Sequence, residues 1–340
     1  MDTAAGSFDA AAGTFDAAGP ELAQDLKTGL EDVEARLREV VVSAHPMLTE
    51  TASHLVEAGG KRFRPLLALL AAQLGDPAAP GVLDAAVVVE LTHLASLYHD
   101  DVMDEADVRR GAPSANTRWT NTVAILTGDY LFARASDFTA GLGTEATHLQ
   151  SRTFARLVEG QIAETAGPAD GQDAVEHHLQ VLADKTGALI ATSARLGAMM
   201  AGATYEAVDT VTRYGEVIGL AFQLSDDLID VRSETGQSGK TPGTDLREGI
   251  RTLPVLLVLA SPDRSPDSER LRELLAGDLD DDERLAEALR LLRRHPAMDD
   301  AVAHLSRCVE QAREIAAELD PGPAREALTS LTEFVLARSG

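Results

Sequence analysis

The chain has 340 residues, of which 44% are hydrophobic and only 4% aromatic, and its formal net charge at pH 7 is −25. A composition dominated by Ala and Leu favours close-packed helices over sheets. Such an acidic protein repels phosphate backbones and anionic membranes, which argues against a nucleic-acid-binding role. An anionic substrate would therefore need a site with its own local cations.

Sequence segments that direct or anchor a protein are not evident. No run of about 18 apolar residues occurs, which predicts no transmembrane segment, and the N-terminal residues lack the basic and apolar regions of a signal peptide. We therefore expect a cytoplasmic protein. Cys308 is the single cysteine, so neither an intrachain disulfide nor a thiolate metal site is expected.

The chain begins with a short repeated segment of small and polar residues, and we expect residues 1–20 to form a disordered N-terminal arm. From residue 21 to 340, apolar residues recur at helical spacing between short Gly, Pro and Asp breaks. This pattern predicts one large domain of roughly a dozen helices, with no convincing strand. We expect an all-α, single-domain helical bundle.

Two aspartate clusters of the same Asp-Asp-x-x-Asp form lie far apart in the chain, at Asp100, Asp101 and Asp104 and at Asp226, Asp227 and Asp230. On a helix, the first and last aspartates of each cluster point the same way and repel each other. A cation would offset this cost, and hard divalent ions prefer oxygen ligands. Mg²⁺ usually completes its shell with water and substrate phosphate, so the clusters predict a phosphorylated substrate.

Four cationic elements accompany the clusters. In chain order they contain Lys61 and Arg64 after paired glycines, Arg109 and Arg110 after the first cluster, Lys185 beside Thr186, and Lys240 after the second cluster. Adjacent arginines followed by a loop glycine suit bidentate recognition of a diphosphate. In an acidic protein, these elements indicate a site for anions.

Together these motifs resemble the trans-prenyltransferase (polyprenyl synthetase) family over about residues 50 to 255. The matching pieces are Gly59-Gly60-Lys61-Arg62-Phe63-Arg64-Pro65, the two aspartate clusters, Arg109-Arg110-Gly111, Gly128-Asp129-Tyr130-Leu131, Lys185-Thr186, Phe222-Gln223 and Lys240-Thr241-Pro242-Gly243-Thr244-Asp245. The resemblance implies a helical bundle of the isoprenoid (class I terpenoid) synthase type with a central active-site cavity. It also implies a homodimer.

The resemblance further implies a role for each matching residue. Three Mg²⁺ ions would be held by Asp100, Asp104 and Asp226, with support from Asp101, Asp227 and Asp230. An allylic diphosphate (dimethylallyl, geranyl, farnesyl or geranylgeranyl) would be bound by Arg109, Lys185 and Lys240. Isopentenyl diphosphate would be bound without metal by Lys61, Arg64, His93 and Arg110. The polar groups beside the developing carbocation would be Thr186 and Gln223.

The helix that carries Asp100 offers a ruler for product length. One helical turn rises about 5.4 Å, close to one extended isoprene unit, and Ala95, Ser96 and Thr92 lie one and two turns below Asp100. Because Ala95 and Ser96 are small, we expect products longer than farnesyl diphosphate. Alternatively, the small residues only permit helix packing, and another wall, such as Phe132 or Phe138, sets the floor.

We therefore expect an all-trans polyprenyl diphosphate synthase, with a geranylgeranyl diphosphate synthase as the alternative. A terpene cyclase would not need the separate isopentenyl diphosphate site, and a non-catalytic synthase subunit would be expected to have degraded aspartate motifs. One position departs from the family pattern. Ile250 stands where many members carry a lysine after Glu248-Gly249, which leaves open whether Arg251 substitutes for it.

Overall fold

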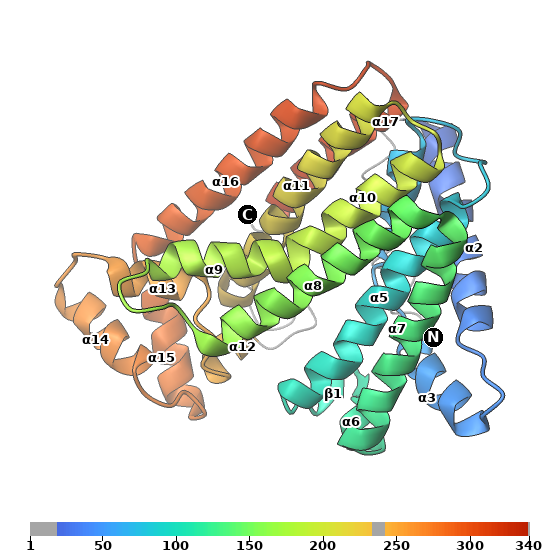
Figure 1. Cartoon of the computed structure of the whole chain (residues 1–340). Helices are drawn as coiled ribbons and strands as arrows, with labels where there is room; N and C mark the ends of the chain where they lie inside the picture. Colours follow the sequence, from blue (N-terminus) through green and yellow to red (C-terminus); the bar gives the residue numbers. More distant parts are fainter. Residues whose placement is uncertain (1–18, 233–241, 339–340) are drawn as a thin grey trace. The chain divides into compact units, whose positions relative to one another are not determined.

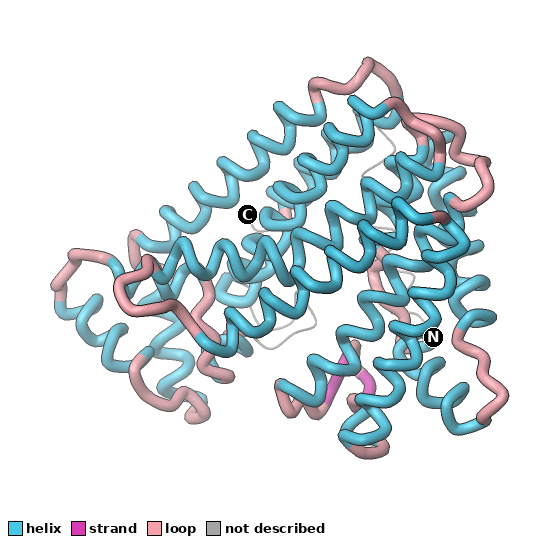
Figure 2. Tube along the Cα trace, viewed as in Figure 1, coloured by secondary structure: helices cyan, strands magenta, loops and turns pink. Residues whose placement is uncertain are grey.

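The computed structural model describes residues 19–232 and 242–338 (Figure 1). The described residues form helices joined by turns, with one two-stranded hairpin, so the all-α prediction is confirmed (Figure 2). The arm expected over residues 1–20 lies almost wholly outside the described residues, within which the first helix begins at Pro20.

The contacts within the chain define two compact units, each assembled from separated segments. Unit 1 comprises Met1–Ala155, Leu189–Gly215 and Ile315–Leu331, and unit 2 comprises Arg156–Ala188, Glu216–Glu314 and Thr332–Gly340. Five helices contribute residues to both units, namely α8 (Thr144–Ala166), α10 (Ala188–Met200), α11 (Tyr205–Arg232), α16 (Ala297–Ala316) and α17 (Pro323–Ala337). The units therefore do not follow one another along the sequence.

Unit 1 is organised around one long buried helix, α5 (Val82–Met103), which packs against α2 (Pro20–Val40), α4 (Phe63–Ala72) and α7 (Asn121–Leu142). Because α5 is apolar on nearly all sides, Val87–Val89 are fully buried and remain helical despite their β-branched side chains. The further elements of unit 1 are α3 (Pro46–Glu57), β1 (Val108–Arg109), β2 (Ala112–Pro113), α6 (Ala115–Arg118) and nearly all of α10.

Gly128 lets α7 approach α5 closely. A Cβ atom at Gly128 would lie 3.1 Å from the carbonyl oxygen of Ala95 and 2.4 Å from His99 Nε2. Any side chain at this position would push the two helices apart or displace His99. The glycine thus fixes α7 against the stretch of α5 that leads to the first aspartate cluster.

The expectation that the chain has no strand is wrong at one place. β1 and β2 form an antiparallel pair in which Val108 lies opposite Pro113 and Arg109 opposite Ala112. Two left-handed residues, Arg110 with φ 52° and Gly111 with φ 76°, form the turn between them. A two-residue loop with two positive φ angles suits a tight hairpin, although Arg110 is an uncommon residue in this conformation.

Unit 2 contains the rest of α8 and α11, most of α16, and a set of shorter helices. The shorter elements are α9 (Ala174–Leu182), the π-helical turn η2 (Ala183–Gly187), α12 (Thr244–Arg247), α13 (Leu253–Ala260), α14 (Pro266–Leu275) and α15 (Asp282–Leu292). Among them, α13 packs on α9, α14 and α15.

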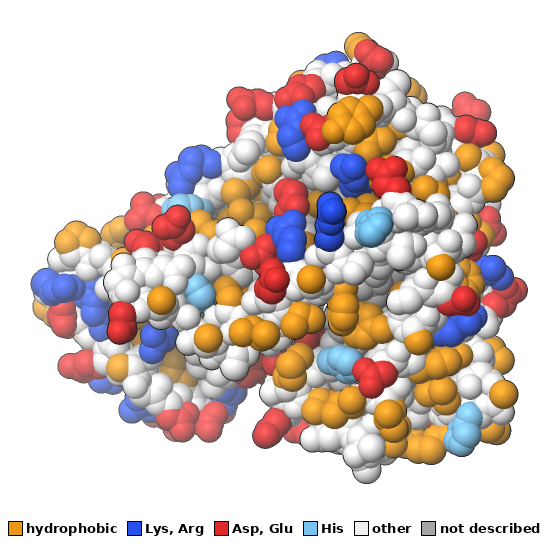
Figure 3. Space-filling model, viewed as in Figure 1, with side chains coloured by type: hydrophobic (Ala, Val, Ile, Leu, Met, Phe, Trp, Pro, Cys, Tyr) orange, Lys and Arg blue, Asp and Glu red, His pale blue; other side chains and the backbone are white. Residues whose placement is uncertain are grey.

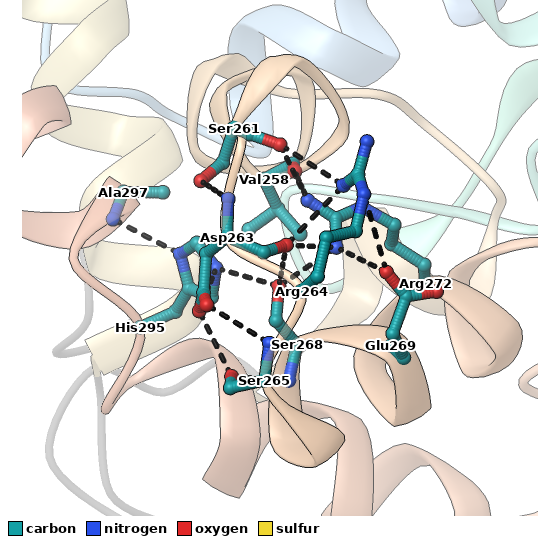
Figure 4. Close-up of polar contacts among 10 residues, drawn as sticks. All are labelled: Val258, Ser261, Asp263, Arg264, Ser265, Ser268, Glu269, Arg272, His295 and Ala297. Atoms are coloured by element: carbon teal, nitrogen blue, oxygen red, sulfur yellow. Dashed lines mark hydrogen bonds and ion pairs between the residues drawn. The ribbon is translucent and has the colours of Figure 1, made fainter.

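A polar network holds the junction between α13 and α14 (Figure 4). Asp263 accepts hydrogen bonds from the backbone N–H and the hydroxyl of Ser265, both at 2.9 Å. Arg272 donates to the carbonyl oxygens of Val258 at 3.0 Å and Ser261 at 2.7 Å, at the C-terminal end of α13 where the last carbonyls lack a full set of helical donors. The network caps one helix and starts the next, so we assign it a structural role.

No helix in the described residues is long and apolar enough to cross a membrane, as the sequence predicts. On the face drawn in Figure 3, acidic and basic side chains lie intermixed at the surface, with apolar side chains between them. The net charge of −25 is therefore not gathered into one patch of a single sign on that face.

Candidate active site

The first aspartate cluster lies at the C-terminal end of α5. Asp100 is half-buried in the last turn, and Asp104 is the exposed C-cap whose N–H donates to the carbonyl of Asp100 at 2.8 Å. Asp101 points elsewhere, because its side chain is fully buried and its Oδ1 accepts a 2.6 Å hydrogen bond from Arg109 Nε. The cluster thus has one half-buried carboxylate, one exposed carboxylate and one that is fully buried against an arginine.

The two arginines that follow the first cluster lie in the hairpin. Arg109 is on β1, and Arg110 is in the turn between the strands. Arg110 Nη1 donates to the carbonyl of Leu55 at 3.2 Å and to that of Gly59. Arg109 is therefore directed to Asp101, and Arg110 to the end of α3.

The paired glycines explain how Arg110 reaches this position. Gly60 has φ 152°, and a Cβ atom there would lie 2.9 Å from Arg110 Cζ. The backbone at Gly60 thus occupies a conformation that side chains disfavour, and it lies against the guanidinium. The glycines before Lys61 create space for an arginine that is 50 residues distant in the sequence.

Sequence reasoning missed a buried ion network beneath this arginine. Arg62, 4% exposed and left-handed with φ 47°, forms ion pairs with Glu34 of α2 and, at 2.6 Å, with Glu90 of α5. Glu90 is 2% exposed and also lies 3.8 Å from Arg110. Buried charges are stable only when they are paired, so Arg62 and Glu90 depend on each other. The usable signal was Glu90 itself, an acid within an apolar helical run.

Arg64 and His93 complete a cationic group in unit 1. Burial lowers the pKa of Arg64 to about 10, although the nearby Glu90 and Asp100 act in the opposite direction. Burial also lowers the pKa of His93 well below its usual value, and the charges of Arg64 and Arg110 lower it further. Arg64 Nε is buried without a hydrogen-bond partner in the described residues. At neutral pH this group holds two arginine charges and a neutral imidazole, and such a group suits an anion. Lys61, the fourth residue expected here, is exposed at the start of the same segment.

The three residues of the expected ruler differ in burial. Ala95 and Thr92 are fully buried, whereas Ser96 is half-buried and donates to the carbonyl of His93 at 2.8 Å. Thr92 accepts a 2.5 Å hydrogen bond from Gln150 of α8. Ser96 lies one turn from Asp100 and is the more accessible of the two small residues.

Phe132 and Phe138, the two aromatic residues that could instead limit product length, lie on α7. The ring of Phe132 lies 5.5 Å from His99 and 4.4 Å from Phe154. Phe138 instead packs against the guanidinium groups of Arg36 and Arg134, at 5.2 and 5.5 Å. Of the two, Phe132 is therefore the one that contacts a residue adjacent to Asp100.

The second aspartate cluster lies near the end of α11 in unit 2, and each aspartate has a different partner. Asp226 Oδ1 accepts a 2.6 Å hydrogen bond from Arg338. Asp227 is buried, with His178 Nε2 at 3.5 Å from Oδ2 and Gln223 Nε2 at 3.5 Å from Oδ1. Asp230 accepts from the backbone N–H groups of residues 244 and 245, at 3.1 and 3.2 Å. Sequence reasoning identified neither Arg338 nor His178.

Lys185 and Thr186 lie in the π-helical turn η2, not in a regular α-helix. Such turns occur frequently at functional sites. Lys185 Nζ forms a 2.5 Å ion pair with Glu164 of α8, and its neighbour Asp184 is held by Arg156 at 2.9 Å. Lys240, the last predicted cation, lies outside the described residues.

The residue in place of the family lysine is exposed. Ile250 is 44% exposed, and its N–H donates to the carbonyl of Asp245 at 2.8 Å. Arg251 is also exposed. These contacts assign no role to either side chain.

The donor atoms of both clusters suit a hard divalent cation. All are carboxylate oxygens, and Oδ2 of Asp101 and Oδ2 of Asp227 are buried without a hydrogen-bond partner in the described residues. Within the same residues, no three Asp, Glu, His or Cys side chains converge as a complete metal site. Mg²⁺ commonly takes only one or two carboxylates and completes its shell with water and phosphate, so the residues fit an ion that binds together with a substrate.

Comparisons with known proteins show which family the chain belongs to. The family model described as "Polyprenyl synthetase" matches residues 45–292. The nonaprenyl diphosphate synthase of Mycobacterium tuberculosis is 49% identical over 319 residues, which cover 94% of this chain and 95% of that protein. A dimethylallyltranstransferase of the same organism is 42% identical over 319 residues, covering 94% and 96%.

A solved structure resembles this chain in both sequence and fold. It is the geranylgeranyl pyrophosphate synthase of Corynebacterium glutamicum complexed with calcium and isoprenyl diphosphate, with a TM-score of 0.85 and 44% identity. The match covers 94% of this chain and 98% of that one. Because the family model spans most of the chain and the relatives match over nearly their full length, the chain belongs to the polyprenyl synthetase family and is a prenyltransferase of the trans-prenyl diphosphate synthase class.

Proposed function

We propose that the protein is an all-trans polyprenyl diphosphate synthase that joins isopentenyl diphosphate to an allylic diphosphate and makes products longer than farnesyl diphosphate. The observation that carries the proposal is the cationic group of unit 1, in which Arg64 and Arg110 lie beside His93. A terpene cyclase acts on one diphosphate and would not need this second set of cations. The group therefore favours a two-substrate condensation.

We assign isopentenyl diphosphate to this cationic group. Arg64 and Arg110, together with Lys61, would hold the diphosphate, and the neutral imidazole of His93 would donate or accept one hydrogen bond. Arg64 Nε has no hydrogen-bond partner in the described residues, so an incoming phosphate oxygen would satisfy a buried donor. No metal is needed for this part of the proposal.

The allylic diphosphate is assigned to the aspartate clusters. Asp100, Asp104 and Asp226 would hold three Mg²⁺ ions, and Asp101, Asp227 and Asp230 would support them. The ions would supply the positive charge that stabilises the departing diphosphate. Further charge would come from Arg109, Lys185 and Lys240, which are proposed to bind the same diphosphate.

The remaining residues would protect and direct the allylic cation. We propose that Thr186 and Gln223 present their polar groups to it, while the apolar face of α5 keeps water away until the isopentenyl double bond attacks. The new carbon–carbon bond leaves a proton to be lost, and the departing diphosphate is proposed to accept it. The product is again an allylic diphosphate, one isoprene unit longer.

The length of the prenyl chain in the product is proposed from Ser96 and from the relatives. The small Ser96 one turn below Asp100 supports products beyond farnesyl diphosphate, and the relative with 49% identity is a nonaprenyl diphosphate synthase. The geranylgeranyl pyrophosphate synthase of Corynebacterium glutamicum, with 44% identity, supports a shorter product. Geranylgeranyl diphosphate synthase therefore remains the alternative.

One assay tests the proposal. The protein is incubated with Mg²⁺, farnesyl diphosphate and labelled isopentenyl diphosphate, and the chain length of the product is measured. We expect elongated product that disappears with EDTA and in Asp100→Ala, but persists in Asp107→Ala, which removes an exposed carboxylate of the same segment. Equal product without Mg²⁺, or full activity of Asp100→Ala, would overturn the proposal.

A further inference from the structure

Arg338 reaches the second aspartate cluster from the far end of the chain. It follows α17 directly, and its Nη2 donates to Asp226 Oδ1 at 2.6 Å, so the pair joins residues 112 positions apart. The side chain of Arg338 is 14% exposed, and that of Asp226 is 36% exposed. Because the contact is partly shielded from water, it is stronger than an exposed surface pair.

Two aromatic rings fix the direction of this guanidinium. Its carbon lies 4.5 Å from the ring centroid of Phe222 and 5.8 Å from that of Phe334. Phe222 is one turn before Asp226 on α11, and Phe334 is one turn before Arg338. Both members of the ion pair thus have an aromatic residue four positions earlier, and the two rings limit the freedom of the arginine.

These contacts leave part of the guanidinium group of Arg338 without a hydrogen bond among the described residues. Arg338 Nη1 is buried and has no hydrogen-bond partner among residues 19–232 and 242–338. An unpartnered charged donor in a shielded place is costly unless something fills it. An anion that arrives beside Asp226 would meet this donor, whereas a cation that binds Asp226 would meet an oxygen already held by Arg338.

We propose that Arg338 is a positioning residue of the second aspartate cluster. It neutralises and orients Asp226 in the metal-free protein, and it competes with a divalent ion for the same carboxylate oxygen until the diphosphate arrives. A diphosphate relieves the competition, because its oxygens can take the released guanidinium. Binding of metal and diphosphate is therefore coupled through the end of the chain. This inference rests on the proposed role of Asp226 as a metal ligand.

Metal binding without substrate is the direct test. Mn²⁺ is titrated into the full-length protein, and free Mn²⁺ is measured by electron paramagnetic resonance, alongside the melting temperature with EDTA and with Mn²⁺. Arg338→Met is expected to melt lower in EDTA, since Asp226 loses its partner. It should also bind Mn²⁺ roughly tenfold more tightly, the factor that a hydrogen bond to a charged group is worth at the low end of its range. Arg338→Lys, which keeps the charge, should fall between Met and wild type.

The matched control is Arg313→Met in the same unit. Arg313 pairs with Glu310 at 2.9 Å on the exposed side of α16, so the same substitution should leave Mn²⁺ affinity unchanged. A second readout adds inorganic diphosphate: it should raise Mn²⁺ affinity more in wild type than in Arg338→Met.

The outcomes separate this inference from the proposed function. If wild type binds Mn²⁺ and Arg338→Met binds it equally well or more weakly, with the same response to diphosphate, the positioning role is overturned while the proposed function stands. If wild type binds no Mn²⁺ even with diphosphate, the proposed metal ligands are wrong and the inference fails with them.

Discussion

The guanidinium group of Arg110 packs directly against the backbone of Gly60, because a Cβ atom at residue 60 would lie 2.9 Å from the guanidinium carbon. We therefore expect Gly60→Ala to displace Arg110 and to raise the KM for isopentenyl diphosphate about tenfold, the factor expected for one weakened charged hydrogen bond. The KM for the allylic substrate should change little. Steady-state kinetics with each substrate varied in turn measure both.

Backbone strain alone must be separated from this effect. Gly202 also has a positive φ, 68°, but a Cβ there would meet no atom within 4 Å. Gly202→Ala should therefore lose about 1–2 kcal/mol of stability from the left-handed conformation while keeping its KM values. Equal KM changes in the two variants would refute the specific role of Gly60.

The buried pair of Arg62 and Glu90 predicts a large loss of stability. Glu90→Gln leaves Arg62 with one carboxylate fewer in a buried place, and removing one partner of a buried ion pair costs about 3–5 kcal/mol. Denaturant unfolding measures the loss. The control Glu50→Gln breaks the exposed pair with Arg118 and should cost at most about 1 kcal/mol. Similar losses in both variants would contradict the buried network.

Product length should respond to Ser96 more cleanly than to Ala95. Ser96→Phe places a ring one turn below Asp100, and we expect it to shorten the main product by at least one isoprene unit in an assay with radiolabelled isopentenyl diphosphate. Ala95 is fully buried, and Gly128 lies close to its carbonyl, so Ala95→Phe should overpack the core and cost about 1–3 kcal/mol. An unchanged product distribution in a folded Ser96→Phe variant would refute the hypothesis that this part of α5 limits product length.

His93 predicts a dependence of stability on pH. Its pKa in the folded protein is well below the value of about 6.5 expected when unfolded. Below about pH 6.5 the unfolded chain therefore takes up a proton that the folded protein refuses, and stability falls as the pH decreases. His93→Gln removes this contribution, so between pH 7.5 and 5.5 the variant should lose about 1 kcal/mol less than wild type. Parallel pH profiles in denaturant unfolding would show that His93 does not contribute.

Local sequence patterns were sufficient to predict the fold class and the family of this protein. The helical spacing of apolar residues predicted the all-α fold, and the two Asp-Asp-x-x-Asp clusters, with their cations, indicated the family. The helices and the motifs can be recognised from residues close together in sequence. Side chains three to four residues apart share one face of a helix, and the residues of a motif recur at fixed spacing. The hairpin carrying Arg109 was missed since its turn uses Arg110, a residue that rarely adopts a positive φ.

Only the tertiary structure decided how the side chains of these motifs are held. Gly60 meets Arg110 across 50 positions, Glu90 meets Arg62 across 28, and Asp226 meets Arg338 across 112. No pattern in the sequence encodes such pairs, since each depends on where distant helices pack. The sequence by itself indicated which charged residues the proposed site uses. The packing of helices determined which of those charges are paired within the protein, because a buried charge is stable only beside its partner.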